Sequence, residues 1–220
     1  MEQAMDRPSP DTARLPIWRR LGTRPTVLWL TGLPAAGKTT IAKATEAALA
    51  ALGYHCVVLD GDELRRGLCR DLGLSDDDRQ EHVRRTAEVA RLLCAHGTLV
   101  LVALISPRIA HRALARQIIG DEAFVEVFVD TPLALAEARD PKGLYRLART
   151  GALSGFTGID AAYEAPPAPH VRLATARMSC ACSVQWTEDQ ASTGRGSSNS
   201  SCSHCTSRRA AGDSGLACHL

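Results

Sequence analysis

The sequence predicts an α/β fold in which helices cover both faces of a parallel sheet. Two observations lead to this prediction. Apolar segments rich in β-branched residues alternate with amphipathic segments along residues 25–175, and the charged residues fall between the apolar segments. The chain has 220 residues and 45% apolar content, which is enough for one domain with a core of ordinary size. We therefore expect one domain at 25–175, a flexible leader at 1–24 and a disordered, Ser/Gly/Cys-rich tail at 176–220.

The individual elements follow in order along this domain. The segments with the length and composition of buried parallel strands are 27–31, 55–60, 98–105, 123–130 and, more weakly, 171–175. The helical patterns are 38–52, 62–70, 78–96 and 109–119, and the third places Val83, Ala87, Ala90 and Cys94 on one face. Such alternation implies right-handed crossovers and ligands at the carboxyl ends of the strands.

Residues 32–39, GLPAAGKT, match the phosphate-binding pattern GxxxxGK[ST] between the first predicted strand and the first predicted helix. The two glycines let successive N–H groups point at one polyphosphate, at the positive end of the helix dipole. The lysine then reaches the β and γ phosphates and the threonine binds Mg²⁺. We expect a P-loop NTPase-type three-layer α/β/α fold with ATP and Mg²⁺ as cofactors. The expected ATP contacts are Gly32, Leu33, Pro34, Ala35, Ala36, Gly37, Lys38, Thr39 and Thr40.

Two carboxylates, Asp60 and Asp62, follow the second predicted strand and should face the γ phosphate. A P-loop kinase needs an acidic group for magnesium-bound water and another group to orient or deprotonate the acceptor hydroxyl. We assign both roles to Asp62, so the expected metal residues are Thr39 and Asp62. The alternative is that Asp62 is only the N-cap of the next helix.

Ser106 follows the third predicted strand and is expected to face the same crevice. Its hydroxyl can bind a substrate, cap the next helix or carry a phosphate as an intermediate. The last role needs an activating base that the sequence does not identify, so direct in-line transfer is the simpler chemistry.

Basic residues cluster near Asp62. A group of arginines lies where the topology places the acceptor, namely Arg65, Arg66, Arg70, Arg79, Arg84 and Arg85. Guanidinium groups bind phosphate and sulfate oxygens bidentately, so the cluster favours an anionic acceptor, although any single arginine is better explained as a solvated helix-face residue. A second basic segment at 139–149 is expected to form a lid over the γ phosphate.

Several segments, in this order and spacing, resemble those of adenylyl-sulfate kinases: GLPAAGKTT, LDGDELRRGL, DLGLSDDDRQEHVRR, LISP, VFVDTPL, EARDPKGLYRLAR, FTGID and YEAPPAP. The resemblance covers residues 25–173. It implies an ATP-dependent phosphotransferase with an alcohol acceptor, which phosphorylates the 3′-hydroxyl of adenosine 5′-phosphosulfate (APS) to give 3′-phosphoadenosine 5′-phosphosulfate and ADP in sulfate assimilation.

The resemblance also implies roles for individual residues. The catalytic residues are Asp62, Lys38 and Ser106, and Ser106 matches the serine to which the family assigns a phosphoserine intermediate. Phe156 is expected to stack on an adenine ring. The implied acceptor contacts are Asp62, Arg65, Arg79, His82, Ile105, Ser106, Lys142, Phe156, Thr157 and Gly158.

Some positions depart from the family pattern. Leu74 replaces the usual phenylalanine, His82 replaces an asparagine, and residues 108–112 lack an expected aromatic residue. One lost charge-assisted contact costs roughly 1.5–3 kcal/mol of acceptor binding. The alternative function is therefore a catalytically weak or inactive nucleotide-binding homologue, which acts as a subunit or has a drifted acceptor.

Composition limits the partners. The net charge is +2 with mixed signs, which argues against nucleic acid. An apolar run of membrane-spanning length and a secretory signal are both missing, so we expect a cytoplasmic protein without a membrane partner. A second copy of the chain and ATP sulfurylase are the protein partners considered. The tail lacks the helical pattern with which the family ends. Its Cys202–Cys205 pair has metal-ligand spacing. Zinc is nevertheless disfavoured, because the sequence between this pair and the other cysteines of the tail offers little to organise a site.

Overall fold

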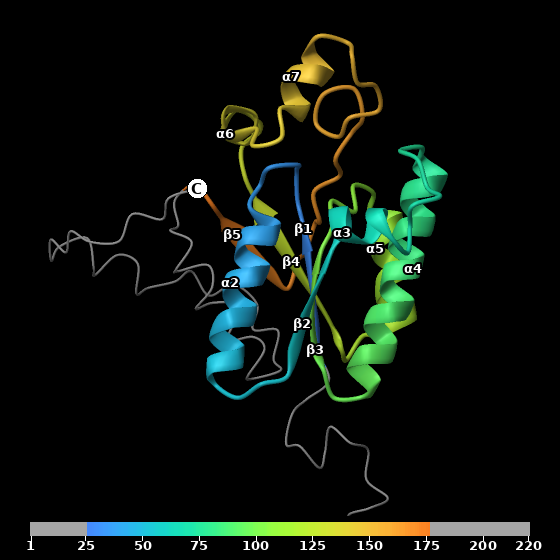
Figure 1. Cartoon of the computed structure of the whole chain (residues 1–220), viewed down its shortest axis with the longest axis vertical. Coiled ribbons are helices and arrows are strands. Elements are labelled where there is room, and N and C mark those ends of the chain that lie inside the picture. Colours follow the sequence, from blue (N-terminus) through green and yellow to red (C-terminus); the bar gives the residue numbers. More distant parts are fainter. Residues whose placement is uncertain (1–25, 177–220) are drawn as a thin grey trace, which may run out of the picture.

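The computed structural model of this chain describes residues 26–176, which form a five-stranded parallel sheet between two layers of helices (Figure 1). The strand order is β2-β3-β1-β4-β5. The strands are β1 (Val27–Thr31), β2 (Cys56–Asp60), β3 (Leu99–Ala103), β4 (Phe124–Asp130) and β5 (Val171–Ala174). The helices are α2 (Lys38–Ala51), α3 (Gly61–Arg66), α4 (Asp76–Ala95), α5 (Ile109–Ile119), α6 (Leu133–Arg139) and α7 (Leu144–Arg149). This arrangement confirms the predicted three-layer α/β/α fold.

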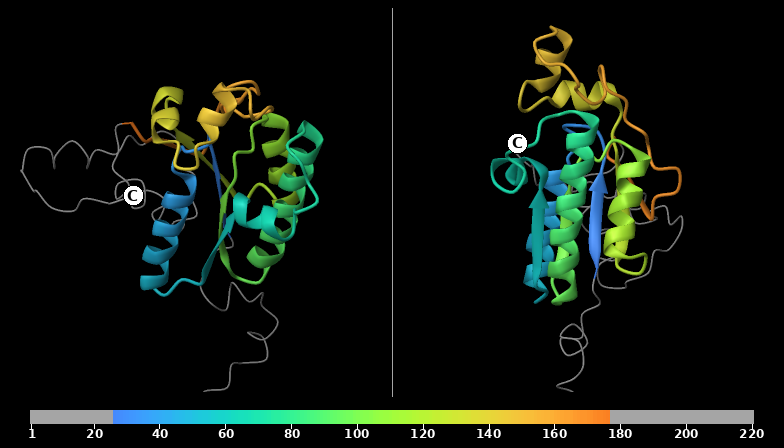
Figure 2. Two further views of the ribbon diagram at one scale, coloured as in Figure 1. Left: turned by 45° about the horizontal axis from the view of Figure 1, so that its top comes forward. Right: turned by 90° about the vertical axis from the view of Figure 1, so that its right-hand side faces the viewer.

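The two faces of the sheet bury two separate apolar clusters. In β1 the side chains alternate, so that Leu28 and Leu30 join the cluster under α2, whereas Val27 and Trp29 join the cluster under α4 and α5. The views in Figures 1 and 2 agree that α2 lies on one side of the sheet and α4 and α5 on the other. The predicted apolar face of the third helix is confirmed, because its four residues are all buried in α4.

Two predicted elements end two or more residues earlier than expected, and a helix lies within the basic segment. The helix α3 ends at Arg66 rather than at residue 70, because the backbone at Gly67 leaves the helical region. The strand β3 ends at Ala103 rather than at residue 105, because its pairing with both β1 and β2 ends at that residue. Within the basic segment 139–149, residues 144–149 form α7, which the sequence reading treated only as a lid.

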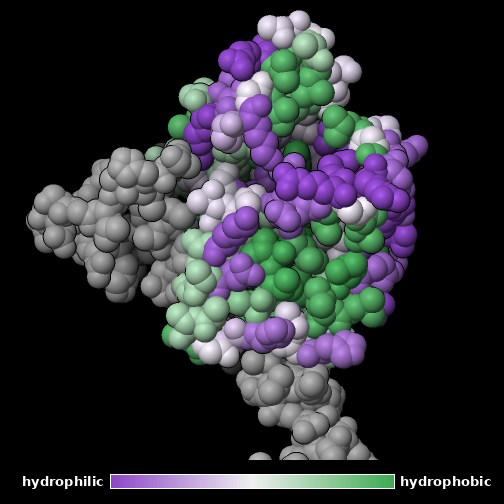
Figure 3. All heavy atoms as spheres, in the orientation of Figure 1, coloured by the Kyte–Doolittle hydropathy of each residue, from purple (hydrophilic) through white to green (hydrophobic). Residues whose placement is uncertain are grey.

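The P-loop, α3 and the α6–α7 segment all lie at the carboxyl ends of the strands, at the upper edge of the sheet in Figure 1. Figure 3 shows hydrophilic side chains gathered beside this edge, above a hydrophobic area between α2 and α4. Among residues 26–176, no helix has the length and apolar character needed to span a membrane. The leader, the tail and the Cys202–Cys205 pair lie outside the described residues.

Candidate active site

The P-loop leaves β1 in a backbone conformation that only a few residues tolerate. Gly32, Ala35 and Gly37 have positive φ angles of 152°, 56° and 101°. A Cβ on Gly32 would lie 2.5 Å from the carbonyl oxygen of Val129, so the loop passes too close to β4 for any side chain at this position. Ala35 is a non-glycine residue in the left-handed region, which costs about 1–2 kcal/mol. These turns are the geometry that aims several N–H groups at one anion.

Lys38, the first residue of α2, folds back over its own loop. Its Nζ donates hydrogen bonds to the carbonyl oxygens of Gly32 at 3.0 Å and Leu33 at 2.7 Å. Burial lowers the pKa of Lys38 to about 8, although Asp62 and Asp60 act in the opposite direction. The lysine is therefore placed at the mouth of the phosphate loop, while Thr40 lies exposed in the next turn.

Asp60, which had no predicted role of its own, is a further candidate site residue. Its Oδ2 accepts a hydrogen bond of 2.6 Å from the hydroxyl of Thr39, and its Oδ1 accepts from the backbone N–H groups of Asp62 and Glu63. Asp60 is therefore the N-cap of α3, and the alternative that Asp62 is the cap is wrong. The signal was present in the sequence, since Asp60 is the last residue of a predicted strand.

Asp62 carries an exposed carboxylate at the same edge. Its side chain is exposed and forms an ion pair with Nζ of Lys142, which lies in the loop between α6 and α7. Exposed ion pairs contribute little to stability, so both groups can change partners at low cost. The structure thus brings together two predicted site residues that are 80 positions apart in the sequence.

The hydroxyls and carboxylates around Thr39 fit a magnesium ion. Oxygen ligands are what Mg²⁺ prefers, and it commonly keeps several waters between itself and the protein carboxylates. The Thr39 hydroxyl and the nearly buried Asp60 carboxylate are already in contact, and Asp62 lies two residues further on. Asp60 therefore joins Thr39 and Asp62 as a candidate metal residue.

Ser106 has an orientation that differs from the prediction. Its hydroxyl accepts a hydrogen bond of 3.0 Å from the indole N–H of Trp29, and the residue is only 2% exposed. Its carbonyl oxygen accepts from the buried Arg112, which also pairs with Glu126. These partners hold Ser106 in its left-handed conformation. The expectation that this hydroxyl faces the crevice is corrected, because the core supplies the partner.

The backbone beside Ser106 remains at the site. The carbonyl oxygen of Ile105 accepts a hydrogen bond of 2.7 Å from the Thr31 hydroxyl at the end of β1. The predicted contact at Ile105 therefore lies directly beside the start of the P-loop, at a backbone position fixed by β1.

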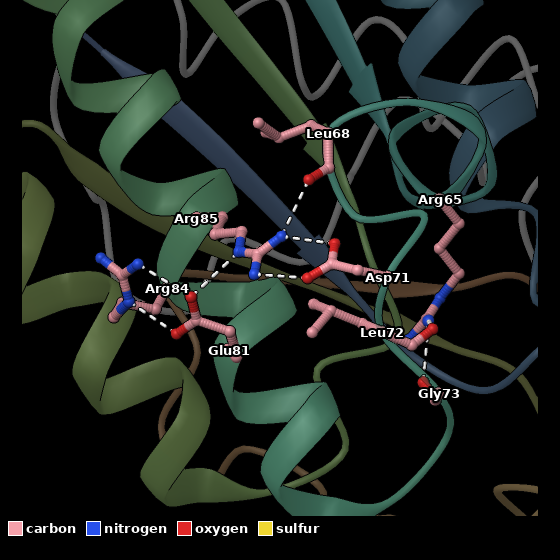
Figure 4. Close-up of polar contacts among 8 residues, drawn as sticks. All are labelled: Arg65, Leu68, Asp71, Leu72, Gly73, Glu81, Arg84 and Arg85. Atoms are coloured by element: carbon pink, nitrogen blue, oxygen red, sulfur yellow. Dashed lines mark hydrogen bonds and ion pairs between the residues drawn. The ribbon is translucent and has the colours of Figure 1, made fainter.

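The arginine cluster divides into paired and unpaired members (Figure 4). Arg85 forms ion pairs with Asp71 and Glu81, and Arg84 also pairs with Glu81. These two positive charges are thus compensated within the protein. Arg65 instead donates to neutral groups, the carbonyl oxygens of Leu72 and Gly73. The acceptor-side charge is therefore smaller than the sequence count of arginines suggested.

Arg79 connects α4 to the segment 155–160. Its guanidinium donates to the carbonyl oxygens of Leu74 at 3.0 Å and Gly155 at 2.7 Å. The Asp160 carboxylate accepts from the backbone N–H groups of Gly155 and Phe156, which closes this segment on itself. Arg79 and the FTGID residues, which were expected at one site, therefore lie together.

Phe156 lies in a more enclosed place than expected. Its ring is 6% exposed and meets the Tyr145 ring edge-on, with 4.9 Å between the centroids. Stacking on an adenine would require the surrounding segment to open. Thr157 is also buried, and a Cβ on Gly158 would lie 3.1 Å from the Leu33 side chain, so this segment packs directly on the P-loop.

His82 lies beneath the Asp60–Asp62 turn. The residue is 5% exposed, its Nε2 has no hydrogen-bond partner within residues 26–176, and its Cε1 lies 3.7 Å from the point where a Cβ on Gly61 would stand. Burial lowers the pKa of His82 to about 4, and the nearby Arg65 acts in the same direction. The imidazole is therefore neutral at pH 7 and adds no positive charge to the acceptor side.

The chain is similar in sequence to known proteins over most of its length. Residues 24–174 match the family model for adenylylsulphate kinase. An adenylyl-sulfate kinase from Pseudomonas aeruginosa is 57% identical over 152 residues, which cover 69% of this chain and 78% of that protein. One from Aeromonas hydrophila is 56% identical over 155 residues, which cover 70% of this chain and 79% of that protein.

Solved structures give the same result. The Mycobacterium tuberculosis APS kinase in complex with AMPPNP and APS is 47% identical, with a TM-score of 0.74 over 76% of this chain and 97% of that one. A hexameric APS kinase from Thiobacillus denitrificans is 28% identical, with a TM-score of 0.56 over 74% of this chain and 27% of that one. The chain therefore belongs to the adenylyl-sulfate kinase family, whose members are ATP-dependent kinases.

Proposed function

We propose that this chain is an adenylyl-sulfate kinase, which transfers the γ-phosphate of ATP to the 3′-hydroxyl of APS. The main observation behind this proposal is that the residues expected to bind the donor and those expected to bind the acceptor lie at the same edge of the sheet. The P-loop with Lys38 lies beside Asp60 and Asp62, close enough for both carboxylates to act on the lysine's pKa. Membership of the family supplies the identity of the acceptor.

On the donor side, the N–H groups of the P-loop and Lys38 hold the β and γ phosphates of ATP. Thr39, Asp60 and Asp62 are the residues that would hold Mg²⁺, either directly or through water. The chemistry that Mg²⁺ would supply there is neutralisation of the negative charge on the phosphates during transfer.

On the acceptor side, Asp62 orients the 3′-hydroxyl and accepts its proton. The hydroxyl oxygen then bonds to the γ phosphorus, and the bond from that phosphorus to the bridging oxygen of ADP breaks. Lys142 already contacts Asp62 and is well placed to move from that carboxylate to an anionic substrate group. Arg65 and Arg79 keep guanidinium charge beside the acceptor, since their hydrogen-bond partners named above are neutral carbonyl groups.

The test is an assay of ADP release that contains MgATP and APS, with 3′-phosphoadenosine 5′-phosphosulfate identified as the product. We expect release of ADP to depend on APS, and to be lost in Lys38→Ala. Binding of neither ATP nor APS to the folded protein would rule out the proposed function.

A second candidate function is a kinase homologue with a drifted acceptor or weak transfer. It is favoured by the acceptor side alone, where Leu74 is 42% exposed at the position of an expected aromatic ring and a buried nitrogen of His82 has no hydrogen-bond partner in the part of the chain that the structure describes. Tight ATP binding without APS-dependent ADP release would support this alternative.

The remaining proposals concern context. A second copy of the chain and ATP sulfurylase are the candidate protein partners, and size-exclusion chromatography with and without the sulfurylase would test both. We also propose a cytoplasmic location, which cell fractionation would check.

A further inference from the structure

We infer that Tyr145 is a positioning residue for the P-loop, whose hydroxyl fixes the peptide between Pro34 and Ala35 so that the Ala35 N–H faces the triphosphate. The inference deepens the proposed function and rests on ATP as the phosphate donor. It assigns a role in nucleotide binding to a residue of α7, outside the P-loop motif.

The contact itself is well defined. The Tyr145 hydroxyl donates a hydrogen bond of 3.0 Å to the carbonyl oxygen of Pro34, and the residue is 1% exposed. Burial raises the pKa of Tyr145 to about 12, so the hydroxyl keeps its proton and remains a donor throughout the neutral range. The ring is held by its edge-on contact with Phe156 and by the apolar cluster that includes Leu33 and Ala35.

This contact also sets the direction of the N–H group that follows it, because the peptide unit is planar. In a trans peptide the C=O and the following N–H point in opposite directions. An anchor on the Pro34 oxygen, on the outer side of the loop, therefore turns the Ala35 N–H toward the opposite side. Ala35 has a φ of 56°, and such a strained residue persists only where its surroundings hold it in place.

The carbonyl group of Ala36, two residues further along the loop, is also held from outside the motif. The Ala36 oxygen accepts hydrogen bonds from the Thr131 hydroxyl at 3.1 Å and from a guanidinium nitrogen of Arg139 at 3.3 Å. By the same argument these two groups orient the Gly37 N–H.

The first two carbonyl groups behave differently. The oxygens of Gly32 and Leu33 are bonded by Lys38, from within the motif. The peptide after Leu33 has no N–H to orient, because the next residue is Pro34. The bonds from outside the motif therefore hold the peptides before Ala35 and Gly37, whose N–H groups would face the triphosphate.

The decisive variant is Tyr145→Phe, which keeps the buried ring and removes only the hydroxyl. Isothermal titration calorimetry with Mg²⁺ and AMPPNP should show a Kd raised about fivefold, the equivalent of about 1 kcal/mol for one neutral hydrogen bond. Because the P-loop binds ground state and transition state alike, KM for ATP should rise while kcat stays within about twofold.

The matched control is Tyr163→Phe. Tyr163 is also largely buried, but its hydroxyl pairs with the Thr31 hydroxyl and anchors no peptide of the P-loop. This variant should leave the Kd for AMPPNP unchanged within about twofold. Thr131→Val, which removes one of the anchors on Ala36, should raise the Kd in the same direction as Tyr145→Phe.

Amide NMR separates positioning from packing. With AMPPNP bound, the Ala35 N–H signal should shift and exchange faster with solvent in Tyr145→Phe than in the unaltered protein. An unchanged Kd together with an unchanged Ala35 signal would overturn the inference, as would a lower melting temperature with no change in Kd. If the unaltered protein itself bound no AMPPNP, the proposed function would fail instead.

Discussion

The hydroxyl of Thr39, the last residue of the P-loop motif, lies 2.6 Å from a carboxylate oxygen of Asp60, the last residue of β2. This contact links the phosphate loop, which follows β1, to the edge strand β2 on the far side of β3, whereas the Asp62 carboxylate pairs with Lys142. It gives the two aspartates different contacts: Asp60 bonds Thr39 and caps α3, whereas Asp62 is left to face the acceptor side. In the proposed function both would hold Mg²⁺, and Asp62 alone accepts the proton of the acceptor hydroxyl.

The first prediction concerns Asp60. Asn caps helices about as well as Asp, so Asp60→Asn should keep the stability of α3 while it removes the charge beside Thr39. The apparent affinity for Mg²⁺ should then fall about 10–100-fold, as for other residues that support metal ligands. A titration of activity against Mg²⁺ concentration checks this, and an unchanged Mg²⁺ requirement would remove Asp60 from the metal site.

Asp62→Ala separates chemistry from binding. Loss of a positioned general base reduces the rate by about 10²–10⁴-fold, so phosphoryl transfer should nearly disappear while ATP binding persists. Lys38→Ala should instead lose both transfer and tight nucleotide binding. Measurement of kcat and of the Kd for AMPPNP in both variants tests this difference. Normal turnover in Asp62→Ala would contradict the proposed mechanism.

Ser106→Ala distinguishes in-line transfer from a phosphoserine route. Removal of the hydroxyl leaves the buried indole N–H of Trp29 without its acceptor, which should cost about 1–3 kcal/mol of stability. Transfer by the folded variant should continue at a rate within about tenfold of normal. Thermal denaturation and kcat are the measurements. A complete loss of turnover with the fold intact would favour the covalent intermediate.

His82 should make stability depend on pH. Its pKa is lowered from 6.5 to about 4 in the folded protein, so between these values the unfolded chain binds more protons. The contribution of His82 to stability is therefore fully present above pH 6.5 and is lost as the pH falls toward 4, by up to roughly 3 kcal/mol.

Urea denaturation at pH 7.5 and pH 5 tests the effect of His82. His82→Asn should reduce the difference between the two pH values, whereas the matched change at the exposed His55 should leave that difference as it is. An equal pH dependence in both variants would show that His82 is not the group responsible.

The protein should also take up a proton when it binds nucleotide at alkaline pH. Burial holds the pKa of Lys38 at about 8, so at pH 9 the amine is mostly neutral, and a triphosphate beside it raises its pKa again. Calorimetry at pH 9 in two buffers of different ionisation enthalpy should detect uptake of about one proton for each ATP bound. The Lys142→Met variant should still take up this proton. Loss of the uptake in that variant would assign the proton to Lys142 instead of Lys38.

The sequence by itself determined the layered fold, the place of the P-loop and the family. Local patterns are sufficient for these three predictions, because strand and helix periods and the GxxxxGK[ST] motif depend only on residues that are close together in the sequence. The apolar face of α4 was predictable for the same reason, since its period follows from the helix alone.

Only the tertiary structure decided which polar groups meet. The partner of Ser106 is Trp29, 77 residues away, and that of Pro34 is Tyr145, 111 residues away. Asp60 meets Thr39, 21 residues away, because the carboxyl end of β2 lies beside the start of α2, and two arginines are compensated by acids on α4 and in the preceding loop. Such pairings depend on how strands and helices pack, because short hydrogen-bond distances depend on the relative position of whole elements rather than on any local run of residues.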